Sequence, residues 1–144
     1  MNQNLENLVK IGKLKAEAFS AKEFAGLVSS AKKRLADARK GSLAPESRFD
    51  LAYNAAHSYA LAALRFHGYR SENRALVFQT LGHTVGMENA KWRVLSKSHD
   101  ARNLAEYEGD TEVDPKLLDE LIRLASELEH AVSMLNVPPF KGPG

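Results

Sequence analysis

The chain contains no cysteine, and this absence removes two kinds of site at once. Without thiols there is neither a disulfide framework nor a thiolate metal centre, and the composition fits a reducing compartment. No apolar run approaches the ~18 residues that a membrane-spanning helix needs. The start M-N-Q-N-L-E also lacks the basic residues and apolar centre of a signal peptide. We therefore expect a cytoplasmic protein that makes no use of a membrane.

Isoleucine and threonine are scarce, and no stretch alternates apolar and polar residues with a period of two. Both are features of strands, whereas the abundant Ala, Leu, Glu, Lys and Arg favour helices. A chain of 144 residues is long enough to bury one substantial core. We expect one all-α domain over residues 1–136, followed by a flexible Pro/Gly tail at 137–144.

Local signals mark where the helices begin and end. Ser20 and Glu23 form a capping box, and Gly41 follows a basic stop. Pro45 and the pair Asp114-Pro115 open two further helices. These signals predict an antiparallel up-and-down bundle of four principal helices, with a short N-terminal helix added. The expected ranges are 21–40, 46–68, 73–108 (broken near Gly82 to Gly86) and 114–136.

The net charge of +2 is spread unevenly along the chain. Residues 1–44 carry a net +5, including the cluster Lys32-Lys33-Arg34, and residues 109–144 carry a net −4. Either the basic region contacts the phosphates of a nucleic acid, or it balances the acidic C-terminal helix within one bundle.

The predicted helical segment 92–108 changes character along one face. Its stripe begins with the apolar Trp92 and Leu95. Further along, at spacings of three and four residues, the stripe and its neighbours become polar: His99, Arg102, Asn103, Glu106 and Tyr107. Residues at such spacings lie on one face of a helix. A stripe that starts in a core and turns polar is either a buried polar network or a functional site.

The run R-N-L-A-E-Y, from Arg102 to Tyr107, resembles the signature of the HEPN superfamily (higher eukaryotes and prokaryotes nucleotide-binding domains). The resemblance covers roughly residues 45–136. It implies an up-and-down helical bundle, and a homodimer in which two Arg-containing motifs face a shared cleft. It also implies an Arg, a polar residue directly after it, and a His a few residues beyond. Here Tyr107 stands where that His is expected, and the next His is His130, in another predicted helix.

In HEPN ribonucleases the 2′-hydroxyl of the RNA attacks the adjacent phosphate without a metal, so the resemblance implies no cofactor. It implies that Arg102 stabilises the developing charge, since a guanidinium matches phosphate oxygens. His99 and Tyr107 are the further catalytic candidates, and Asn103 and Glu106 join Arg102 in binding the ligand. A tyrosine of ordinary pKa ~10 is a poor general base at neutral pH.

Three functional hypotheses follow. The first, favoured by the missing His, is a non-catalytic or atypical HEPN-like domain that binds RNA or a nucleotide beside a partner such as a nucleotidyltransferase. The second is a metal-independent ribonuclease, the toxin of a toxin–antitoxin pair. The third is a structural bundle, in which Arg102 pairs with Glu106.

Glu127 and His130 have the Glu-x-x-His spacing of a di-iron site. A di-iron bundle uses two Glu-x-x-His pairs and this chain has one, so we expect Glu127 and His130 to be surface residues.

Overall fold

Helices dominate the computed structural model, which describes residues 3–108 and 112–138 but not the side chains of residues 105–108. The long helices are α2 (Ala21–Ala38), α3 (Pro45–Phe66), α6 (Asn89–Glu108) and α7 (Pro115–Ser133). The shorter ones are α1 (Gln3–Lys10), α4 (Arg74–Gln79) and α5 (Leu81–Thr84). The expectation of an all-α protein is confirmed in this coarse form. Residues 139–144 of the predicted tail lie outside the described residues.

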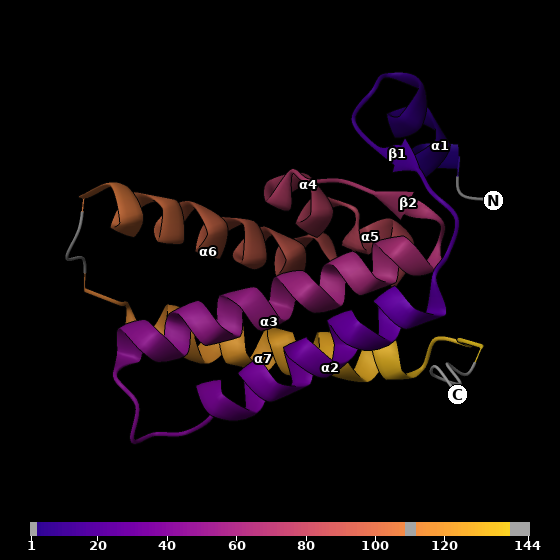
Figure 1. Ribbon diagram of the computed structural model, residues 1–144. Helices are drawn as coiled ribbons and strands as arrows, with labels where there is room; N and C mark the ends of the chain where they lie inside the picture. Colours follow the sequence, from indigo (N-terminus) through magenta and orange to yellow (C-terminus); the bar gives the residue numbers. More distant parts are fainter. Residues whose placement is uncertain (1–2, 109–111, 139–144) are drawn as a thin grey trace.

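Helix α3 is the centre of the core. In Figure 1 it runs across the middle of the molecule, with α2 and α7 along one side and α6 on the other. Six of its alanines are completely buried, so neighbouring helices approach it closely on several sides: Ala52, Ala55, Ala56, Ala60, Ala62 and Ala63. A helix with small or apolar residues around most of its circumference belongs in a core. No helix in the described ranges is long and apolar enough to cross a membrane.

The predicted helix starts are confirmed by their caps. The Ser20 side chain accepts a hydrogen bond from the backbone N–H of Glu23 at 3.2 Å. Asp114 caps α7 by accepting from the N–H of Lys116 at 2.9 Å. The predicted helical segment 73–108 is interrupted near Gly82 to Gly86, as expected. Helix α5 ends at Thr84 and α6 begins at Asn89. These caps place the helix ends through local chemistry alone.

The structure adds one element that the sequence did not predict. Strand β1 (Lys15–Ala16) pairs antiparallel with β2 (Tyr69–Arg70), with Lys15 opposite Arg70. The pair joins the N-terminal segment to the connection that follows α3. In Figure 1, α1 and β1 project from one end of the helical body, beside β2. Strands of two residues carry no alternation, which explains why the pattern missed them.

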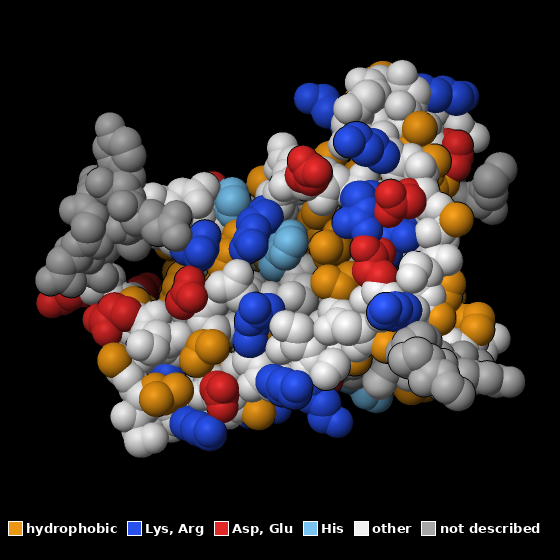
Figure 2. Space-filling view, viewed as in Figure 1, with side chains coloured by type: hydrophobic (Ala, Val, Ile, Leu, Met, Phe, Trp, Pro, Cys, Tyr) orange, Lys and Arg blue, Asp and Glu red, His pale blue; other side chains and the backbone are white. Residues whose placement is uncertain are grey.

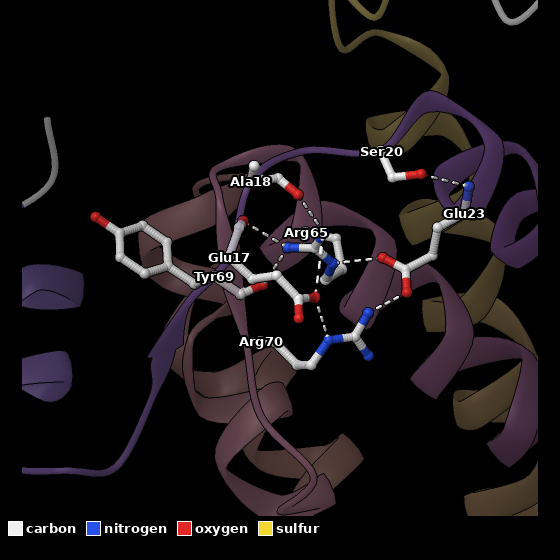
Figure 3. A network of polar contacts seen from close by, with 7 residues as sticks. All are labelled: Glu17, Ala18, Ser20, Glu23, Arg65, Tyr69 and Arg70. Atoms are coloured by element: carbon white, nitrogen blue, oxygen red, sulfur yellow. Dashed lines mark hydrogen bonds and ion pairs between the residues drawn. The ribbon is translucent and has the colours of Figure 1, made fainter.

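A buried arginine holds this junction together (Figure 3). The side chain of Arg65 is only 2% exposed. Its Nε donates to the Glu23 carboxylate at 2.5 Å, and its terminal nitrogens donate to the carbonyls of Glu17 at 2.9 Å and Ala18 at 2.7 Å. Arg70 binds the carboxylates of both Glu17 and Glu23. A buried charge is tolerated when it is paired in this way, so the network fixes the chain before α2 onto the end of α3.

Candidate functional site

The polar end of the predicted stripe lies on α6, where His99 and Arg102 contact α3. His99 Nδ1 lies 2.7 Å from the hydroxyl of Tyr53, in a hydrogen bond between the two helices. Arg102 Nε donates to Asp50 Oδ1 at 3.1 Å. Asn103 Nδ2 lies 3.1 Å from His99 Nε2. The structure therefore brings His99, Arg102 and Asn103 together, as the spacing predicted.

Two predicted site residues cannot be placed in this group. The side chains of Glu106 and Tyr107 lie outside the described residues, so their predicted roles stay predictions. The same holds for a pair between Arg102 and Glu106. Among the described residues, Arg102 pairs with Asp50, which belongs to a different helix and stands 52 positions away in the chain.

Tyr53 is the centre of the cluster. Its side chain is completely buried. The His99 ring stacks on the Tyr53 ring, with centroids 6.0 Å apart and planes inclined by 25°. The guanidinium carbon of Arg102 lies 5.0 Å from the ring centroid, and that of Arg74, from α4, lies 5.6 Å from it. Both distances are within the range of a cation–π interaction, so one fixed ring holds two guanidinium groups in place.

Sequence reasoning missed the half of this site that α3 supplies. Asp50, Tyr53, Asn54 and His57 repeat at spacings of three and four, so they form one stripe on α3. Arg74 extends the stripe by donating to Asn54 Oδ1 at 3.0 Å. The signal was present as D-x-x-Y-N-x-x-H, the same kind of spacing that drew attention to α6. Tyr53 is an aromatic residue of the core, although its hydroxyl also serves the site.

His57 binds a proton more weakly than an exposed imidazole does. Burial first, and then charge interactions with Arg74 and His99, lower its pKa from 6.5 to about 4. The imidazole is therefore neutral at pH 7. Its Nε2 is buried and has no hydrogen-bond partner among the described residues, which leaves a polar atom unsatisfied beside the site. Such an atom costs about 1–3 kcal/mol of stability.

Among the described side chains, the two arginines of the cluster have different kinds of partner. Among the described residues Arg74 forms no ion pair with a carboxylate, because its hydrogen-bond partner is the neutral Asn54. Arg102 is paired with Asp50, but the Asp50 side chain is 57% exposed and water screens the pair. Figure 2 shows His side chains beside Lys and Arg side chains on the surface near α6 and α4. Two guanidinium groups that contact one tyrosine ring are suited to binding a planar or tetrahedral anion.

The remaining candidates from the sequence do not join this cluster. Glu127 forms an ion pair with Lys91 at 2.8 Å and lies 3.5 Å from Arg123, while His130 is exposed on α7. The side chains of the basic run Lys32-Lys33-Arg34 are exposed on α2. In the described part of the chain, no three acidic or His side chains gather as metal ligands.

No family model matches this chain, and a search of curated proteins finds no match. The functional argument therefore depends on the geometry and charge of the α3–α4–α6 cluster.

Proposed function

We propose that this protein is a HEPN-like helical-bundle domain that binds a phosphate group of RNA or of a nucleotide through Arg102. It acts as a non-catalytic or atypical member beside a partner such as a nucleotidyltransferase. The observation that carries the proposal is the position of Arg102. Its side chain is 24% exposed, so it reaches solvent, and the Tyr53 ring and Asp50 hold its guanidinium in one orientation. A guanidinium oriented before the ligand arrives loses little entropy on binding.

The surroundings of His99 favour binding over cleavage. A ribonuclease of this kind needs a general base with a lone pair directed at the substrate hydroxyl. Both ring nitrogens of His99 already have partners, Tyr53 at Nδ1 and Asn103 at Nε2. The Asn103 Nδ2 group can only donate, so His99 Nε2 uses its lone pair as the acceptor. A neutral ring then carries its proton on Nδ1 and donates it to Tyr53, which leaves no lone pair for a substrate.

We also propose that the chain pairs as a homodimer through the side of the bundle that contains α6. Leu104 supports this, because it directly follows Asn103 and its side chain is 51% exposed. A large apolar residue beside a charged cluster is placed where a second copy could bury it. Light scattering at micromolar concentration measures the oligomeric state directly, and a monomeric mass would contradict the pairing.

Fluorescence anisotropy with a labelled single-stranded RNA, and competition by ATP, test the proposed binding. We expect Arg102→Gln to weaken the binding of RNA and of ATP by roughly 10- to 100-fold, the range for losing a charge-assisted hydrogen bond. Arg93→Gln is the matched control. Arg93 lies on the same helix and its guanidinium sits 5.6 Å from the Trp92 ring, but it is exposed and outside the cluster.

The outcomes separate the hypotheses. Binding by the wild type that survives Arg93→Gln and is lost in Arg102→Gln, with unchanged helix content in circular dichroism, supports the proposal. No binding by the wild type refutes it and favours a structural bundle. RNA cleavage that resists a chelator and disappears in both Arg102→Gln and His99→Ala would instead establish a ribonuclease.

A further inference from the structure

We propose that Arg74 is the second guanidinium of the same site, so that a single phosphate group binds between Arg74 of α4 and Arg102 of α6. This inference rests on the proposed function, since it names the residue that completes the phosphate site. It assigns a binding role to a short helix that carries no part of the Arg102 motif.

The first support is the shared contact with Tyr53. The two guanidinium carbons lie 5.6 Å and 5.0 Å from the centroid of one buried ring. They reach this ring from separate helices, α4 and α6, which pack against each other. Both arginines are half-buried rather than fully enclosed. Two guanidinium groups that contact one ring and are partly open to solvent provide the donors that a tetrahedral anion needs.

The second support is the charge that Arg74 leaves uncompensated. Asn54 accepts one of its hydrogen bonds at 3.0 Å and orients the guanidinium, but an amide does not neutralise it. A cation that is partly removed from water attracts an anion more strongly than an exposed one does, because screening is weaker there. A phosphate bound at Arg74 would supply the negative charge that Asn54 does not.

The third support is the neighbouring His57, which reports on the charge of the site. Its pKa is lowered mainly by burial, and then by Arg74 and His99. An anion bound at Arg74 would offset this repulsion and raise the pKa of His57. The titratable groups that act on this imidazole are Arg74 on α4 and His99 on α6, and the Phe78 ring packs against it. The shift is visible by NMR in the imidazole protons of the unmodified protein.

The test uses the full chain and two phosphate probes, a labelled single-stranded RNA and ATP. Arg74→Gln should weaken RNA binding roughly 10- to 100-fold, as loss of a charge-assisted hydrogen bond does. It should also reduce the slope of log affinity against log salt by ~0.7, the contribution of one phosphate contact on a single strand. Arg93→Gln should change neither quantity. Loss of ATP binding as well would identify the phosphates of a free nucleotide as the ligand, and loss of RNA binding alone would identify the RNA backbone.

Two results would overturn the inference. If Arg74→Gln binds like the wild type while Arg102→Gln does not, Arg74 is not part of the site, although the proposed function stands. If Arg74→Gln loses helix content, the wild type is measured instead. Saturating RNA or ATP should then raise the pKa of His57, and an unchanged pKa contradicts the inference. Absence of any binding by the wild type would refute the proposed function itself.

Discussion

Replacing Arg65 with methionine should lower the free energy of unfolding by about 3 kcal/mol. Breaking a buried ion pair by removing one partner costs ~3–5 kcal/mol, because the other partner stays buried without compensation. For Arg65→Met we expect a loss near the lower end of this range. Glu23 is 33% exposed and stays paired with the guanidinium of Arg70, so its charge remains compensated. The carbonyls of Glu17 and Ala18 lose a donor but belong to exposed residues, where water can replace it.

Urea denaturation followed by circular dichroism measures this loss, and the denaturant slope should stay the same since the same surface unfolds. The matched control is Arg70→Met. Arg70 binds the same two carboxylates, but its side chain is 28% exposed, so its removal should cost no more than about 1 kcal/mol. Hydrogen exchange should also speed up at Lys15 and Ala16, because Arg65 helps to hold β1 against β2. Equal losses for Arg65→Met and Arg70→Met would refute the idea that burial of Arg65 makes the network strong.

The same network predicts a pH dependence through Glu23. Burial raises the pKa of Glu23, but the hydrogen bonds and charges of Arg65 and Arg70 outweigh burial and lower it below the usual 4.5. A carboxyl with a depressed pKa in the folded state contributes stability that is present above its unfolded value and lost as the pH falls through the folded one. The difference in stability between the wild type and Arg65→Met should therefore narrow below pH 4.5. A difference that stays constant down to pH 3 would contradict this account.

Three further predictions concern the α3–α4–α6 cluster. Because the pKa of His57 falls from 6.5 to about 4, wild-type stability should fall as the pH drops through that window, and His57→Leu should remove this dependence in urea titrations. Tyr53→Phe should stay folded and lose roughly 0.5–1.5 kcal/mol, the value of one hydrogen bond, in the same assay. Asp50→Asn should tighten RNA binding in the anisotropy assay, because it removes the carboxylate that competes with phosphate for Arg102; weaker binding would show that Asp50 orients the guanidinium more than it competes.

The helices could be predicted because residues close together in the sequence determine where they begin. Ser20 and Glu23 cap α2, and Asp114-Pro115 starts α7, within a few positions of one another in the chain. The β pair could not be predicted in this way. It depends on Arg65, which meets Glu17 and Glu23 across more than forty positions. A charged residue inside the apolar run A-L-A-A-L-R-F was the available signal, since a buried Arg requires partners that the local sequence does not show.

Only one half of the candidate site was visible in the sequence for a similar reason. Spacing showed that His99, Arg102 and Asn103 share a face of α6, but spacing says nothing about which helix that face meets. Tyr53 and its neighbours on α3 have the same periodicity, and without the packing they are consistent with an ordinary boundary between core and solvent. Arg74 was still less visible, because α4 has only six residues and lies between two turns.

The two arginine clusters of this protein differ in a way that bears on function. Arg65, 2% exposed, has carboxylates and carbonyls arranged around its guanidinium, as a purely structural cation requires. Arg74 is also partly withdrawn from water, yet an amide is its hydrogen-bond partner among the described residues. If the second cluster served stability alone, the same solution would be expected there. Methionine at Arg65 should therefore change stability and leave phosphate binding intact at a temperature where the variant is folded. Arg102→Gln or Arg74→Gln should weaken phosphate binding and leave stability nearly unchanged. If variants of both clusters changed stability and phosphate binding together, the two clusters would not have separate roles.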